Sequence, residues 1–215
     1  MERKTAEARS YNFEIRREKR EEGGSRLSGR AIVYDTATDI GGWFREIIDR
    51  GALDGADLTD VPLLVNHDRH MIPVARSRRN TPNSTLRLLV NDFGLDFEAD
   101  LDTERNMTAR ELDSAAERGD LDGCSFEFWV DEERWEDLDS DYPTRHIIKF
   151  AKIGEISAVT WPAYDTTTLN ARSKEALDSA RSALESARQR QAPAVDTAEI
   201  NKELELLKAK LNIIS

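Results

Sequence analysis

The chain has 215 residues, of which 39% are hydrophobic and 34% are charged, and its formal net charge is −11 at pH 7. A chain of this length accommodates one domain with a sizeable core and additional appendages. The acidic excess argues against nucleic acid as the main partner, because phosphate binding requires a basic face.

Membrane and disulfide classes are also disfavoured. Every apolar run is shorter than the roughly 20 residues that span a bilayer, and residues 1–20 lack the apolar stretch of a signal peptide. We therefore expect no membrane partner and a location in the cytoplasm of the cell that makes the protein. Cys124 is the only cysteine, so an internal disulfide is impossible and a cysteine-based zinc site is disfavoured.

The N-terminal segment differs in composition from the central part of the chain. Residues 1–28 carry many charges of both signs and include a Gly-Gly-Ser break at 23–25. This composition predicts a flexible arm with a short strand near Tyr11–Ile15. The pattern changes at Gly29, and residues 29–170 are expected to form the folded domain.

Short apolar runs separated by turn residues predict strands in the first part of that domain. They are Ala31–Tyr34, Val61–Val65, Leu86–Val90 and Leu95–Leu101. The last two flank Asn91-Asp92-Phe93-Gly94, which predicts a hairpin, and alternation of Leu95, Phe97, Ala99 and Leu101 indicates a half-buried strand.

A helix and three further strands are expected next. Asp102 or Thr103 is suited to cap the helix and Gly119 to end it. Gly123–Val130 reads as a strand with Ser125 and Glu127 on the face opposite Cys124 and Phe126. Residues 131–141 hold seven acidic side chains and one arginine, which predicts a solvated loop. Strands are expected again at His146–Ala151 and Ile153–Trp161.

Residues 171–215 are rich in Ala, Glu, Arg, Ser and Lys and predict a helical tail with a linker. One exposed helix is expected at Ser173–Gln191 and a second at Ala198–Leu211. In the second, Ile200, Leu204, Leu207 and Leu211 follow a heptad-like spacing. That spacing leaves open a homo-oligomer formed through this helix and a helix that docks on another apolar surface.

Together these elements predict a β-rich α+β fold, namely a small, mostly antiparallel barrel or sandwich with one or two packed helices. We see no internal repeat.

Histidine is the usual base for a serine nucleophile, because its unperturbed pKa lies near neutrality. His67 follows an apolar strand, a position that suits either a site residue or an ordinary loop histidine. A metal site built from His67, Asp68 and His70 is a further alternative. A His-x-x-His spacing on a strand, however, places the two rings poorly for binding one metal ion.

Ser125 stands between a small residue and a strand rich in aromatic side chains, which would fix its backbone as a nucleophile requires. An ordinary strand serine fits the same pattern. Alternation places Glu155 and Ser157 on one strand face with Ile153 and Val159. A carboxylate on such a face needs a partner and could orient a histidine. An edge-strand glutamate in water is the alternative.

In chain order, several motifs resemble the prohead (procapsid) maturation proteases of tailed phages, which are distantly similar in fold to the herpesvirus assemblin proteases. The motifs are Gly29–Tyr34, Trp43–Ile48 with Gly51-Ala52-Leu53, Asn66-His67-Asp68, Gly94-Leu95, Gly119–Phe128 and Ile153–Tyr164. The resemblance covers about residues 26–170. Glu127 departs from it, since the family often has glycine between the two aromatic residues after the serine.

The resemblance implies that Ser125 is the nucleophile and His67 its base. It implies a third member on the strand after the nucleophile, for which Glu155 is our choice and His146 the second choice. It gives no oxyanion donors, and main-chain N–H groups near Arg76–Arg79 or Ser125 are candidates. It implies no cofactor.

The resemblance also implies the biological role. Such a serine endopeptidase acts inside the procapsid in the host cytoplasm, cleaves scaffold or the N-terminal segment of the major capsid protein, and also cleaves itself. A helical tail suits a segment that directs incorporation. A capsid assembly protein of the same fold without activity is the main alternative, and a metal-dependent hydrolase is the second.

Overall fold

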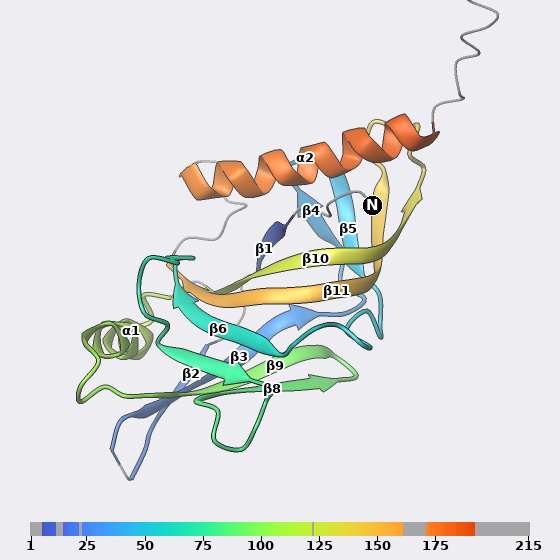
Figure 1. The fold of residues 1–215 in the computed structure, drawn as a ribbon. Coiled ribbons are helices and arrows are strands. Elements are labelled where there is room, and N and C mark those ends of the chain that lie inside the picture. The colour runs from blue at the N-terminus through green and yellow to red at the C-terminus, as the bar shows by residue number, and fades with distance from the viewer. Residues whose placement is uncertain (1–5, 12–14, 22, 122, 161–170, 192–215) are drawn as a thin grey trace, which may run out of the picture.

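A computed structural model of the chain describes residues 6–11, 15–21, 23–121, 123–160 and 171–191, with backbone alone at 171–177. The described residues form two β-sheets and two helices (Figure 1). In this part of the chain, no helix is both long enough and apolar enough to cross a membrane.

The larger sheet carries the residues of interest. Its strands are β1 (Glu7–Tyr11), β4 (Thr38–Ile40), β5 (Phe44–Ile48), β6 (Asp60–Val65), β7 (Ala75–Arg78), β10 (Gly123–Glu136) and β11 (Thr144–Val159). The long strand β11 lies between β10 on one edge and both β5 and β6 on the other, pairing in parallel with β5 near its start and with β6 near its end. The other pairs of this sheet are antiparallel.

The smaller sheet is antiparallel and packs against the larger one (Figure 1). Its strands are β2 (Arg16–Lys19), β3 (Ser25–Val33), β8 (Leu86–Asn91) and β9 (Gly94–Leu101). One core of buried apolar side chains draws on both sheets, including Leu27 of β3, Phe97 of β9, Phe126 of β10 and Ile156 of β11. The predicted β-rich α+β fold with mostly antiparallel pairing is confirmed as two packed sheets.

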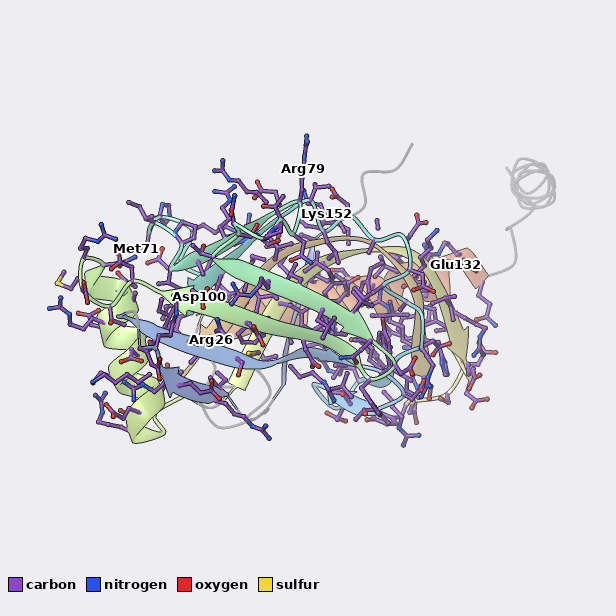
Figure 2. The ribbon with its side chains drawn as sticks, turned by 90° about the horizontal axis from the view of Figure 1, so that it is seen from below. Arg26, Met71, Arg79, Asp100, Glu132 and Lys152 are labelled. Carbon is purple, nitrogen blue, oxygen red and sulfur yellow. The ribbon has the colours of Figure 1, made fainter. Side chains whose placement is uncertain are left out.

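The outer face of the smaller sheet is covered by charge pairs. Figure 2 shows Arg26 and Asp100 side by side on this face, where the guanidinium of Arg26 donates to the Asp100 carboxylate at 3.1 Å. Arg87 donates to the same carboxylate at 2.8 Å. This face of the smaller sheet is therefore polar.

The structure adds strands to the predicted N-terminal arm and packs the tail helix against the larger sheet. Residues 7–11 pair with β10 and residues 16–19 with β3, inside the segment for which a flexible arm was predicted. The predicted strand near Tyr11–Ile15 lies partly outside the described residues. The domain boundaries themselves stay predictions.

The tail helix α2 (Ala171–Gln191) is present where it was predicted, but it is not exposed on all sides. Its buried Ala180, Leu184 and Ala187 pack with Ile40, Phe44 and Leu138, so that α2 lies over the β4–β5 end of the larger sheet (Figure 1). The second predicted tail helix, Ala198–Leu211, lies outside the described residues.

Three local predictions need correction. The helix α1 (Met107–Arg118) begins later than expected and is capped by Asn106, whose side chain accepts from the Ala109 N–H. Residues 131–136 are strand rather than loop, because Glu132–Glu136 pair with the start of β11. From Glu132 on, their side chains alternate between exposed and half-buried. The two strands predicted at 146–161 form one strand with irregular register. Gly119 ends α1 in the left-handed conformation, as predicted.

Candidate active site

A tight turn after β6 places His67 over β11. Asn66 and His67 both adopt positive φ, 49° and 60°, in the left-handed region that non-glycine residues seldom occupy. The turn is held at both residues: the Asn66 N–H donates to the Ala158 carbonyl at 2.9 Å, and the His67 N–H donates to the Ser157 hydroxyl at 3.1 Å. Such strained backbone persists only where surrounding contacts hold it, and it is common at functional sites.

The imidazole of His67 is paired with a buried carboxylate. His67 Nδ1 is in hydrogen-bond contact with Glu155 Oε1, and the Glu155 side chain is 1% exposed whereas that of His67 is 23% exposed. The second carboxylate oxygen, Oε2, accepts from the Ser157 hydroxyl at 2.6 Å. Both oxygens of the buried acid are therefore satisfied, and the ring of His67 is held with Nε2 as its unengaged nitrogen among the described contacts.

A β-bulge turns Glu155 toward His67. Along β10 and β11 the partners are Glu127 with Glu155 and then Phe128 with Ile153, so that Gly154 is the extra residue. Ile153 and Ile156 both enter the core, and Glu155 is left on the opposite face. Simple alternation along this strand would have placed Glu155 and Ile153 on one face.

Ser125 lies on the neighbouring strand at the level of this cluster. Its register partner on β11 is Ser157, the residue that bonds both Glu155 and the His67 backbone. Strands β10 and β6 flank β11, so that their backbones are about 10 Å apart. Ser125 is fully buried, and its hydroxyl donates to the Arg9 carbonyl at 2.8 Å rather than to His67.

Of the residues proposed from sequence, the structure thus brings His67 and Glu155 into contact and sets Ser125 beside them on the same face. A family model described as caudovirus prohead serine protease matches residues 12–181, more than half of the chain. The chain belongs to the caudovirus prohead serine protease family. No curated protein and no solved structure gives a significant match.

His146, the second choice for the third member, lies away from this cluster. Its Nδ1 contacts Asp49 Oδ1 at 2.8 Å, and its Nε2 faces Glu136 at 3.6 Å, near the start of β11. Glu155 lies toward the other end of the strand, next to His67. The geometry therefore favours Glu155 over His146 as the third member.

The metal alternative receives no support from the arrangement of His67, Asp68 and His70. His67 uses Nδ1 on Glu155, and Asp68 accepts from the His70 backbone N–H at 2.9 Å. Within the described ranges, no group of three or more His, Cys, Asp or Glu side chains is arranged to hold a metal ion.

The candidate oxyanion donors near Arg76–Arg79 are engaged elsewhere. The N–H groups of Arg76, Arg78 and Arg79 donate to the Thr85 hydroxyl, the Ser84 hydroxyl and the Thr59 carbonyl, respectively. Figure 2 shows the Arg79 side chain pointing away from the body of the protein. These groups are therefore not free to meet an oxyanion at Ser125.

Glu127 lies on β10 opposite Glu155, next to the candidate site. Its carboxylate accepts from Arg69 at 2.5 Å. Burial raises the pKa of Glu127, Arg69 and His67 oppose this effect, and the negative charge of Glu155 reinforces it. Alternation placed Glu127 on the face of Ser125, as observed. It also placed Glu155 and Ser157 on the face of Ile153, which is wrong because the bulge at Gly154 puts Ile153 in the core.

Proposed function

We propose that this chain is the endopeptidase of procapsid maturation, with Ser125 as nucleophile, His67 as general base and Glu155 as the residue that orients His67. The observation that carries the proposal is the His67 Nδ1 contact with buried Glu155, beside the serine strand. A carboxylate on Nδ1 fixes the tautomer in which Nε2 accepts a proton.

The reaction is acyl transfer. His67 Nε2 removes the proton of Ser125 Oγ as this oxygen bonds to the carbonyl carbon of a peptide. The same proton then passes to the leaving amine as the C–N bond breaks. Water deprotonated by His67 attacks the ester, which releases the new carboxylate and restores Ser125. Ser125 and His67 must come within hydrogen-bonding distance for the first step, so the Ser125 hydroxyl must leave the Arg9 carbonyl.

We infer the substrates from the resemblance of the sequence motifs to those of prohead proteases. They are the scaffold, the N-terminal segment of the major capsid protein and the protease chain itself, all inside the procapsid of an infected cell. The tail that includes α2 would direct incorporation into that shell.

Co-expression of the full chain with its major capsid protein tests the proposal. Intact-mass measurement should show a shortened capsid protein with the wild type and full-length capsid protein with Ser125→Ala or His67→Gln, because loss of either residue costs several orders of magnitude in rate. His146→Gln is the matched control and should leave processing intact. Equal processing by Ser125→Ala would instead favour a non-enzymatic assembly role.

A further inference from the structure

Strand β1 occupies the outer edge of the strand that carries the candidate nucleophile. It runs antiparallel to β10, with Ser10 opposite Ser125 and Ala8 opposite Glu127. Without β1, this edge of β10 would present unpaired N–H and C=O groups beside Ser125. An extended peptide binds to such an edge by adding a strand, so β1 and a peptide running along this edge would compete for the same place.

The contact between β1 and Ser125 resembles that of a bound peptide. The Ser125 hydroxyl donates to the carbonyl oxygen of Arg9 at 2.8 Å. A hydroxyl has one proton to donate, so in this arrangement it is not donated to His67. Ser125 is also fully buried, so its hydroxyl is shielded from solvent.

The Arg9 side chain fills a built ionic pocket behind the strand. Its guanidinium donates to both oxygens of Glu46 on β5, at 2.6 and 2.7 Å, and both side chains are 0% exposed. The guanidinium carbon also lies 5.3 Å from the centre of the Phe128 ring. Both oxygens of one carboxylate and the face of an aromatic ring are the contacts expected for a bound guanidinium.

The residue two positions earlier enters the same pocket. Both oxygens of Glu7 accept from Arg145 on β11, at 2.6 and 2.8 Å, and Arg145 also donates to Glu46 and Glu133. With β1 removed, the pocket would retain the Glu46 and Glu133 carboxylates and the Arg145 guanidinium, and Glu46 would lose its Arg9 partner. The pocket complements a strand that supplies one acid and one arginine, separated by a single residue so that both face the same side.

We propose that β1 occupies, within the same chain, the position of a substrate strand, and that the site accepts extended segments with an acidic residue two positions before an arginine. The proposal rests on the proposed protease function and specifies its substrate class. The carbonyl presented to Ser125 is that of the arginine, so the bond cut in a substrate is the one on its carboxyl side. In the resting protein, β1 holds the site closed until it is displaced.

Labelling of Ser125 by a fluorophosphonate tests the closed state in the full chain. Arg9→Gln and Glu46→Gln remove the same ion pair from different strands, and each should raise the labelling rate at least about tenfold over the wild type, the effect of losing one charge-assisted hydrogen bond. Arg16→Gln, an exposed arginine on β2, is the matched control and should not change the rate. Near-ultraviolet circular dichroism checks that each variant is folded.

Synthetic nonapeptides test the specificity. Added to the Arg9→Gln protein, the peptide of residues 5–13, TAEARSYNF, should slow labelling and be cut between its arginine and the following serine. Replacing its arginine or its glutamate by alanine should weaken both effects. Peptide protection also distinguishes an opened site from an unfolded variant, which no peptide would protect.

The outcomes separate the two proposals. Equal labelling of the wild type and both pocket variants would overturn the closed state, and indifference to the arginine would overturn the specificity, while the protease assignment would survive either result. Absence of Ser125 labelling in every form, together with unprocessed capsid protein, would overturn the protease assignment itself.

Discussion

At the residue scale, the site depends on contacts that a linear reading cannot display. His67 is held by its backbone N–H on Ser157 and by its ring on Glu155, and Ser157 also bonds Glu155. Three residues separated by up to 90 positions thus form one hydrogen-bonded unit. Because buried polar groups must be satisfied together, loss of one member should disturb the others.

Glu155→Gln should lower kcat by about 10²- to 10⁴-fold with little change in KM. The amide keeps the size of the side chain but removes the charge that stabilises protonated His67, and it permits the wrong tautomer. Steady-state kinetics on a peptide or on capsid protein measures the effect. Asp49→Asn removes the partner of His146 and should leave kcat nearly unchanged; an equal loss in both variants would contradict the role given to Glu155.

Ser157→Ala should lower kcat about tenfold, since it removes the hydroxyl that links the His67 backbone to Glu155, and one such hydrogen bond contributes about 1–1.5 kcal/mol. Ser157→Thr keeps a hydroxyl and should recover most of the rate. The kinetic comparison of the two variants separates this positioning role from simple packing. Loss of equal size in both would count against it.

At the element scale, the hairpin of β10 and β11 decides where the acid lies. The bulge at Gly154 shifts the register so that Glu155 faces His67 while Ile153 and Ile156 stay in the core. The glycine also leaves room for neighbouring side chains: an added Cβ would lie 2.6 Å from Trp129 Cζ3 and 2.8 Å from Glu127 Oε1, so these side chains would have to shift. Both distances are far inside van der Waals contact.

Gly154→Ala should therefore destabilise the protein by about 1–3 kcal/mol, the usual cost of overpacking, and should lower activity by moving Glu155. Urea unfolding gives the free energy. Adding Trp129→Leu removes the nearest obstacle, so the double variant should lose less stability than the sum of the two single variants. Additive losses would mean that the bulge does not depend on this contact.

At the scale of the whole molecule, a buried ionic cluster ties the N-terminal strand to the larger sheet. Arg9 and Glu7 of β1 meet Glu46 of β5 and Arg145 of β11. The helix α2 adds a further tie, since Ser179 donates to the Ala6 carbonyl at 3.2 Å. Removing one partner of a buried ion pair is strongly destabilising, because the other charge is left uncompensated.

The cluster should make stability depend on pH. Burial by itself would raise the pKa of Glu7, but Arg145 and Arg9 lower it from 4.5 to about 2. The folded protein then binds fewer protons at this group than the unfolded chain does, so the stabilisation is complete above about pH 4.5 and is lost as the pH falls toward 2. Glu7→Gln should thus be less stable than the wild type at pH 6, by a difference that shrinks toward pH 3.

Urea unfolding midpoints between pH 3 and pH 6 measure that difference. The exposed Glu18 of β2 provides the control, and Glu18→Gln should show no comparable dependence. A difference between Glu7→Gln and the wild type that stays constant over this range would show that the Glu7 charge is not responsible.

Much of the fold is predictable from local sequence. The hairpin at residues 91–94 formed as predicted because turn residues separate two apolar runs, and Leu95, Phe97, Ala99 and Leu101 are all buried as their alternation indicated. The acidic run at 131–136 was misread because its composition is that of a loop, whereas cross-strand partners such as Lys149, opposite Glu132, neutralise it. Pairing between distant segments overrode composition there.

Local sequence was sufficient to predict the β-rich class and the strand faces of Ser125 and Glu127, whereas the choice of His67, Ser125 and Glu155 as candidates came from the resemblance of the motifs to prohead proteases. The folded arrangement was needed to show that Glu155, and not His146, contacts His67, that Ser157 links Glu155 to the His67 backbone, and that β1 lies along β10. The physical reason is that local propensity fixes which way a side chain points along its own strand, whereas register, bulges and strand order fix what it meets.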